Sequence, residues 1–249
     1  MTRSATSKKL ATISIALVMA LVLEKPCASA SGSDAVKDLV EKSRMTLESF
    51  LEDSNMTWFR DHVKDAKGVF IVPQLLKGAF FFGGEGGSGI FLVKDDKTGE
   101  WSQPAFYTMG SGSFGFQFGG QASEVILLVL TQRGIESLLT STFKLGGDVS
   151  VAVGPVGAGM EGATALNLSA DMLSFARAKG LFGGISLEGT VIATRDQWNR
   201  TYYGKDVRPT DILVKRAVTN PQSANLRATL DRAVKGAPPP TQADTATKE

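Results

Sequence analysis

The chain has 249 residues, of which 43% are hydrophobic and 21% charged, with 27 glycines but only one cysteine and one histidine. This length suits one domain, or two small ones, with a substantial core. The aliphatic and aromatic content excludes disorder along the whole chain. A disulfide scaffold needs two cysteines, so it is excluded as well, and so is most metal and nucleophile chemistry that depends on histidine or cysteine.

The first 30 residues have the plan of a secretory signal peptide. Arg3, Lys8 and Lys9 precede an uncharged apolar run over residues 10–23, and Ala28-Ser29-Ala30 is an A-x-A cleavage signal. The run is shorter than the roughly 20 residues that a transmembrane helix needs. We therefore expect cleavage after residue 30, export across the inner membrane and a periplasmic or envelope-associated protein. A retained N-terminal anchor is the alternative.

The net charge of +2 belongs to this leader. The leader holds four basic residues and one acidic residue, so without it 23 basic and 24 acidic residues remain, a net charge of −1. Cys27 leaves with the leader, and Glu24-Lys25-Pro26 before it does not fit a lipobox. A nearly neutral chain has no global attraction for nucleic acid or anionic membranes, so contact with lipid must come from a local patch. We expect no nucleic-acid partner.

Amphipathic periodicity predicts helices at both ends of the chain. Apolar residues recur at three- to four-residue spacing over residues 33–53, and a second short helix is predicted over 58–65. Near the end, helices are predicted over 212–218 and 224–234. The proline-rich, polar residues 236–249 are interpreted as a disordered tail.

Between these helices, short apolar or alternating runs bounded by glycine predict strands. Residues 95–99 predict a hairpin turn, residues 133–140 a short helix, and residues 172–177 one or two helical turns. The fold class is therefore α+β, with a glycine-rich, mainly antiparallel β core framed by N- and C-terminal helices, in one domain over residues 31–235. The predicted strands are residues 69–72, 80–82, 90–93, 113–118, 125–130, 148–153 and 184–192.

Two segments of the chain resemble each other. Lys77-Gly78-Ala79-Phe80 and Lys179-Gly180-Leu181-Phe182 are each followed by a glycine-rich strand and then by a basic-acidic pair. Chance similarity among glycine-rich strands explains this as well as an internal repeat does. A true repeat predicts two equivalent β units related by a pseudo-symmetry axis.

No enzyme signature is found. The pattern G-x-G-x-x-G begins at Gly84 and again at Gly110, but each match runs into a predicted strand instead of opening a helix. A dinucleotide site needs that helix N-terminus, so these glycines are interpreted as turns, bulges and close backbone approaches. His62 lies in a charged helix with no presented nucleophile, which favours a solvated surface residue. We expect no catalytic residue, cofactor or metal.

Basic residues stand next to apolar ones at two places, which suits an interface with anionic lipid. The cation meets the phosphate while the apolar side chain enters the acyl boundary. The alternative is that the apolar residues are buried and the lysines are ordinary solvated groups. The candidate lipid-binding residues are Lys67, Lys77, Phe80, Phe81, Arg177 and Lys179.

Several runs, in order, resemble the SYLF domain family over about residues 34–230. They are AKGVFIVP (66–73), GGSGI (86–90), WSQPA (101–105), LGGD with VAVGPVG (145–157), and KGLFGGISLEG followed by Asn199 and YYG (179–204). The resemblance implies a lipid-binding module: eukaryotic members bind phosphoinositides and other anionic phospholipids, fungal relatives also bind and bundle actin, and bacterial members are mostly secreted or envelope proteins.

Two departures limit what the resemblance carries over. Ala158 follows the GP-x-G turn where family members often have a basic residue, and the helix from Asp34 is mixed in charge where eukaryotic members have a basic segment. Both departures argue against inositide-type selectivity. Actin binding is not carried over either, because actin has no place in a bacterial envelope. We expect a non-enzymatic phospholipid-binding protein that attaches peripherally to anionic membrane surfaces of the cell envelope. The alternative is an envelope structural or protein-interaction module with a protein partner and no intrinsic lipid specificity.

Overall fold

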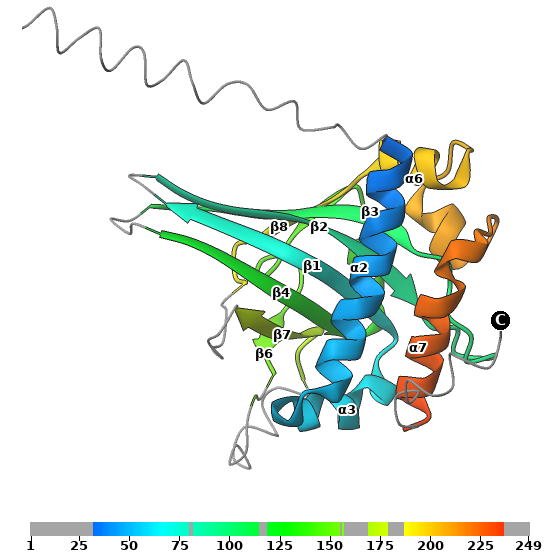
Figure 1. Ribbon diagram of the computed structural model, residues 1–249, viewed down its shortest axis with the longest axis horizontal. Helices are drawn as coiled ribbons and strands as arrows, with labels where there is room; N and C mark the ends of the chain where they lie inside the picture. Colours follow the sequence, from blue (N-terminus) through cyan, green and yellow to red (C-terminus); the bar gives the residue numbers. More distant parts are fainter. Residues whose placement is uncertain are drawn as a thin grey trace, which may run out of the picture. The chain divides into compact units, whose positions relative to one another are not determined.

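The computed structural model describes residues 32–79, 82–114, 119–154, 156, 169–178 and 187–236. In this part of the chain an eight-stranded sheet packs against helices that come before and after it in sequence (Figure 1). The predicted α+β class is confirmed. The predicted leader lies outside the described residues, and so does the predicted tail apart from Gly236.

The strands lie in the order β5-β8-β3-β2-β1-β4-β7-β6 across the sheet. Every pairing is antiparallel except that of β6 with β7, which is parallel. The long strands β1 to β4 form its centre. The strands are β1 (Gly68–Ala79), β2 (Phe82–Val93), β3 (Ala105–Phe114), β4 (Gly119–Val129), β5 (Thr142–Lys144), β6 (Val151–Val153), β7 (Met172–Ala178) and β8 (Val191–Thr194).

The helices at the two ends of the described chain lie side by side on the sheet: α2 crosses β1, and α7 packs against α2 (Figure 1). No helix among the described residues is long and apolar enough to span a membrane. The helical segments are α2 (Gly32–Glu52), η1 (Ser54–Met56), α3 (Thr57–His62), η2 (Val63–Asp65), α4 (Gln132–Leu139), α6 (Asp196–Tyr203), η3 (Thr210–Val214), η4 (Pro221–Ser223) and α7 (Ala224–Val234).

Most predicted helices are confirmed, with changes at their ends. α2 matches the prediction to within one residue, and α7 matches it fully. The predicted helix over 58–65 divides into α3 and the 3₁₀ turn η2. The predicted helix over 212–218 is instead the π-helical turn η3, and Arg216 beyond it has a left-handed backbone (φ 51°) that a continuing helix does not allow.

Both faces of the sheet are packed, because successive strand residues point to opposite sides. Val69 and Ile71 belong to the core that contains the buried residues of α2, α3 and α7. Phe70 and Val72 belong to a second core on the other face, with Ile135 of α4. The two cores together fix β1 at the centre of the fold.

A β-bulge interrupts β1 at Pro73. From Val72 to Leu75 β1 advances three residues while its partner β4 advances two, from Val125 to Ser123. Proline has no N–H to give to a ladder, and bulges are one of the few places where a strand tolerates it. The extra residue reverses the alternation, so Leu75 is 2% exposed in the second core, whereas Leu76, on the face that α2 covers, is 53% exposed.

Two predictions near the end of the sheet are wrong. Residues 172–177, predicted as helical turns, form β7, which lies between β4 and β6. Its residues are buried almost without a break, so the run shows no alternation that marks a strand. The strand predicted over 184–192 is found only from Val191, where β8 begins, because residues 187–190 form a turn in which Gly189 has a positive φ of 80°. Residues 184–186 lie outside the described residues. The predicted turn over 95–99 is confirmed, with the Gly99 N–H donating to the Asp95 carbonyl at 2.9 Å.

The predicted strand over 69–72 is part of the longer β1, which pairs with β2. Of residues 80–82, Phe82 begins β2 and the other two lie outside the described residues. Of residues 113–118, the first two end β3 and the rest lie outside the described residues. Among the described residues, β2, which follows Lys77, pairs with β1, whereas β8 lies between β5 and β3, away from β7. Residues 179–186, which hold most of the second repeat unit, lie outside the described residues.

Candidate functional site

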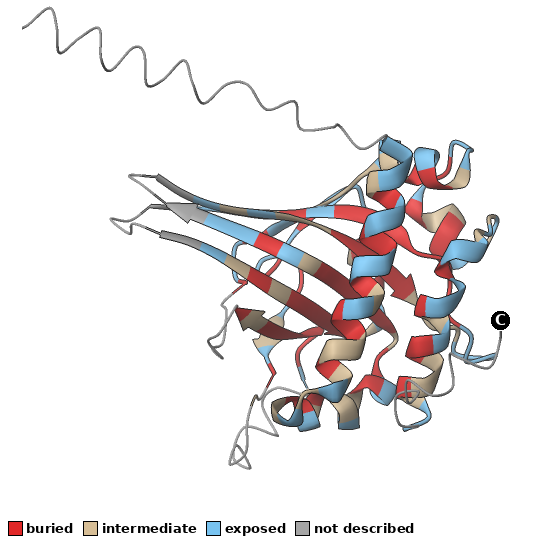
Figure 2. Cartoon of the chain, viewed as in Figure 1, coloured by how far each residue is buried: buried red, intermediate tan, exposed pale blue. Residues whose placement is uncertain are grey.

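One end of the sheet projects beyond the helices. Figures 1 and 2 show β1 to β4 running past α2, with exposed and half-buried residues along this part. On the α2 side of this projecting end, the strand registers put glycine at nearly every position. The two rows are Gly112, Gly84, Gly78 and Gly120, then Gly110, Gly86, Leu76 and Ala122.

This glycine face is open at Gly84, Gly86 and Gly112. A Cβ added to Gly84 would approach no atom closer than 3.7 Å, one added to Gly86 none closer than 3.9 Å, and one added to Gly112 would meet nothing within 4 Å. Glycine weakens a strand relative to residues with a side chain. Steric crowding within the chain therefore does not account for these three glycines.

The opposite face of the projecting end carries a polar row. Lys77 is exposed, and its cross-strand neighbours are Glu85 on β2 and Gln121 on β4. Glu85 accepts a hydrogen bond from the Ser111 hydroxyl at 2.9 Å. The charge of Lys77 thus stands beside one carboxylate, on the face that points away from α2.

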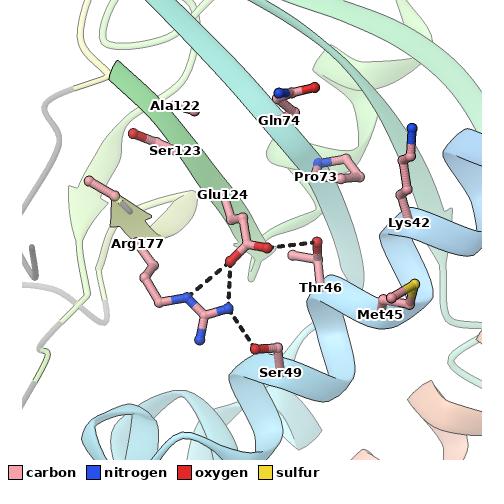
Figure 3. Close-up of a pocket in the computed structure, with 11 residues that line it drawn as sticks. Lys42, Met45, Thr46, Ser49, Pro73, Gln74, Ala122, Ser123, Glu124 and Arg177 are labelled. Atoms are coloured by element: carbon pink, nitrogen blue, oxygen red, sulfur yellow. Dashed lines mark hydrogen bonds and ion pairs between the residues drawn. The ribbon is translucent and has the colours of Figure 1, made fainter. Parts of the chain in front are cut away.

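A groove of about 560 Å³ lies where α2 meets the projecting end of the sheet (Figure 3). We call it the α2 groove. Its walls come from one flank of the helix and from the β1 bulge, with the neighbouring strands β4 and β7. The lining residues are Lys42, Met45, Thr46 and Ser49 of α2, Pro73 and Gln74 of β1, Ala122, Ser123 and Glu124 of β4, and Arg177 and Ala178 of β7.

Arg177 closes one end of the α2 groove through a network of ion pairs (Figure 3). Its Nε and Nη2 donate to Glu124 Oε2 at 3.0 and 2.5 Å, and Nη2 also donates to the Ser49 hydroxyl at 2.6 Å. Its Nη1 lies 3.4 Å from Asp53 Oδ2. The guanidinium also stands over the ring of Phe50, 5.1 Å from the centroid. Arg177 therefore ties α2 to β4 and β7.

The same network perturbs Asp53. Burial on its own would raise the pKa of this carboxyl, but hydrogen bonds from Asn55 and Arg177 outweigh burial and hold the pKa below its usual value. Asp53 is also the N-cap of η1, accepting the Asn55 N–H at 2.9 Å. The carboxylate is thus ionised at neutral pH and balances the charge of Arg177 together with Glu124.

The predicted lipid-binding residues are not gathered at one place. Lys67 lies at the start of β1 and pairs with Asp96 at 3.0 Å, whereas Lys77 lies near the other end of that strand, about 30 Å away at the rise of a strand. Arg177 lies in the α2 groove, on the opposite face from Lys77. The remaining candidates, Phe80, Phe81 and Lys179, lie outside the described residues.

The sequence reasoning missed the α2 groove. Met45 is exposed and stands off the apolar stripe of α2, and Ala122 belongs to a strand end that carried no pattern of its own. One signal was available: Pro73 inside an apolar run indicates a bulge or an edge. That signal places a distortion in β1, but not the helix flank that faces it.

Two other sequence predictions can be placed. The first glycine pattern, from Gly84 to Gly89, lies inside β2 and opens no helix. Of the second pattern, Gly110 and Gly112 lie inside β3, and Gly115 lies outside the described residues. His62 is half-buried, not fully solvated: its ring stacks on Trp58 at 3.6 Å, and its Nδ1 lies 2.9 Å from the Trp58 carbonyl oxygen. Within the described ranges, no three His, Cys, Asp or Glu side chains are grouped so that they could hold a metal ion.

These features define an α+β module: a helix-covered sheet with an open glycine-rich end and a groove beside α2. Residues 110–233 match the family model described as "Ysc84: Las17-binding protein actin regulator". The chain belongs to this Ysc84/SYLF domain family, as its sequence motifs indicated.

Curated relatives agree. The chain is 34% identical over 170 residues to the human SH3 domain-containing YSC84-like protein 1, covering 68% of this chain and 49% of that protein. It is 32% identical over 191 residues to LAS seventeen-binding protein 3 of Saccharomyces cerevisiae, covering 73% and 41%. A Xenopus laevis relative of the human protein is 32% identical over 171 residues, covering 68% and 50%. The chain spans about half the length of these relatives or less.

Proposed function

We propose that the protein is a non-enzymatic phospholipid-binding module that attaches peripherally to anionic membrane surfaces through the projecting end of its sheet. Membership of the Ysc84/SYLF domain family supports this. The observation that carries the proposal is the pair Leu76 and Lys77, an exposed apolar residue followed by an exposed cation where β1 runs past the helices.

The two side chains favour an end-on contact. Leu76 and Lys77 point to opposite faces of the sheet, so a membrane that meets only one face reaches only one of them. A membrane that receives the end of the β1–β2 hairpin reaches both. A cation near an anionic leaflet contributes about 1 kcal/mol, and the burial of an apolar side chain adds to it.

This orientation determines which of the predicted lipid-binding cations can reach the membrane. Lys67 is at the far end of β1 and already pairs with Asp96. Arg177 is neutralised by Glu124 and Asp53. Lys77 is therefore the main described cation of the contact. β7 and β1 run in the same direction, because both are antiparallel to β4. Lys179 directly follows Ala178, the last residue of β7, and is included in the proposed contact for this reason.

The proposal also includes the cell envelope as the place of action. Its support is the leader sequence: a basic start, a 14-residue apolar run and an A-x-A site. N-terminal sequencing of the protein isolated from envelope fractions tests this part. A mature chain that begins at Ser31 is the expected result, and a chain that retains Met1 in the cytoplasm contradicts it.

The test of lipid binding is co-sedimentation with vesicles of graded anionic content, at low and high salt, using the full chain and a version that starts at Ser31. We expect binding that grows with anionic lipid and fades with salt. The double variant Lys77→Glu, Lys179→Glu should lose it. The matched control is Lys97→Glu, Lys205→Glu, which reverses two exposed lysines away from the projecting end.

Two results would overturn the proposal or its site. The absence of sedimentation at every lipid composition favours the protein-interaction alternative, for which a pull-down from envelope extract is the next experiment. Binding that survives the Lys77/Lys179 reversal shows that the contact lies elsewhere on the chain.

A further inference from the structure

We propose that the α2 groove holds one acyl chain of an anionic lipid, with the ammonium of Lys42 against the lipid's anionic group. This inference rests on the proposed function and adds a site for a single lipid molecule, apart from the contact of the projecting end with the membrane surface.

The groove has the size and construction of a ligand site. Its volume of about 560 Å³ falls within the range of roughly 300–1,000 Å³ that is typical of pockets for small molecules. It lies where the bulge at Pro73 interrupts β1 beside the flank of α2. Its walls belong to a helix and to paired strands, so the groove is formed before any ligand arrives.

Part of the groove lining is apolar. Met45, Pro73, Ala122 and Ala178 line it, and Met45 is 56% exposed although it is one of the larger apolar side chains of the protein. An acyl chain laid along the groove would cover Met45 and remove apolar surface from water. Methionine is flexible and polarisable, which suits contact with a chain that has no fixed shape.

The charges of the groove select an anion. At one end Arg177 is matched by Glu124 and Asp53. Lys42, toward the other end (Figure 3), makes no hydrogen bond or ion pair with any residue that the structure describes. The two carboxylates outnumber the guanidinium at the Arg177 end, and Lys42 is the lining cation that no described carboxylate pairs with. A phosphate or carboxylate at the head of the lipid complements it, whereas a neutral or cationic head does not.

The groove also has room for the rest of a chain. Ala122 pairs with Leu76 in the sheet, and beyond them lies the open glycine face of Gly84 and Gly112. A chain longer than the groove can therefore continue over positions where Gly84 and Gly112 present no side chain. The exposed Leu76 would pack beside it.

The experiment is isothermal titration of the full chain with decyl phosphate, held below its aggregation concentration so that no membrane or micelle forms. Inorganic phosphate is the second probe. We expect saturable binding of one decyl phosphate per chain and no binding of inorganic phosphate, because the apolar chain supplies most of the affinity. Binding of both probes with equal affinity overturns the proposal, since it then reports only a phosphate site.

Two variants with matched controls locate the site. Lys42→Glu should weaken decyl phosphate binding about fivefold or more, and Lys37→Glu, an exposed lysine of the same helix outside the groove, should not change it. Ala122→Phe fills the groove and should abolish binding, while Ala228→Phe on the exposed face of α7 should leave it intact.

Folding is checked by thermal unfolding, and Met45→Asp, on the exposed flank of α2, serves as a further groove variant if Ala122→Phe is unstable. Unchanged binding in the folded groove variants overturns the proposal. If the wild-type chain binds vesicles but not decyl phosphate, only the lipid site in the groove is overturned, and the proposed membrane attachment stands. If it binds decyl phosphate but not vesicles, the membrane attachment is overturned, and the lipid site in the groove stands.

Discussion

Asn199 of α6 accepts the backbone N–H of Phe106 through its Oδ1 atom at 3.0 Å, across 93 residues of sequence. Phe106 lies just beyond the residues of β3 that pair with β8, so its N–H has no partner in that strand. Asn199 supplies the missing acceptor and is itself fully buried. One side chain thereby fixes the position of α6 on the sheet.

Replacement of Asn199 by alanine should destabilise the protein. It leaves the buried N–H of Phe106 without an acceptor, which costs about 1–3 kcal/mol. Urea unfolding of Asn199→Ala, compared with Asn225→Ala on the exposed face of α7, measures the effect. Equal stabilities of the two variants would show that water replaces the amide at no cost.

Removal of Arg177 should also be costly. Arg177→Met keeps the apolar stem of the side chain but leaves the carboxylates of Glu124 and Asp53 without their main partner in a half-buried setting. Side chains that are about a quarter exposed are partly screened by water, so we expect a loss of about 1–3 kcal/mol, below the cost of a fully buried pair. A double-mutant cycle with Glu124→Gln should give a coupling of about 0.5 kcal/mol or more. If the stability losses of the two single variants simply add, Arg177 and Glu124 do not stabilise each other.

Asp171 should make stability depend on acid pH. Burial alone would raise its pKa, but hydrogen bonds from Thr131 and Ser150 and the charge of Arg133 hold the pKa below its usual value. The stability from this carboxylate is present above the unfolded-state pKa and is lost as pH falls through the lower folded-state pKa.

The variant Asp171→Asn should therefore be less stable than the wild type at pH 7, and the difference should shrink below about pH 4. Thermal unfolding from pH 7 down to pH 2.5 measures it. A difference that stays constant over this range would mean that the hydrogen bonds, and not the charge, carry the contribution.

Gly154 should tolerate no side chain. A Cβ at this position would overlap the ring of Phe175, which is held in the buried core edge-to-face with Phe59 and cannot move aside freely. We expect Gly154→Ala to lose about 1–3 kcal/mol by overpacking. Gly112→Ala, at the open glycine face, should be neutral or slightly stabilising, because alanine loses less backbone entropy than glycine. Equal Tm changes for the two variants would contradict this reading of the glycines.

The sequence predicted the helices better than the strands, for a physical reason. α2 and α7 each bury one stripe, and a stripe at helical spacing is visible without knowledge of the partner. β7 is covered on both faces, so Met172 and Leu173 are both buried and no alternation remains in the sequence. A short apolar run of this kind does not distinguish a strand from a buried helix.

The site was less predictable still. Lys77 could be proposed because a cation next to Leu76 is a local pattern. The partners of Arg177 could not, because Ser49 and Glu124 are 128 and 53 residues away along the chain. The α2 groove depends on how α2 crosses a bulged strand, a relation between distant segments that no local pattern records.

The extra residue in β1 predicts how a relative with one residue fewer in this strand would differ. Deletion of Pro73 would leave one residue between Val72 and Leu75, as in a regular strand, so the pairing of β1 with β4 would stay in register on both sides of the deletion. Leu75 would remain in the second core and Lys77 on the face that points away from α2, but the groove would lose Pro73 from its wall. A relative one residue shorter at this point would therefore present the same side chains on each surface of its projecting end and differ only in the shape of its groove.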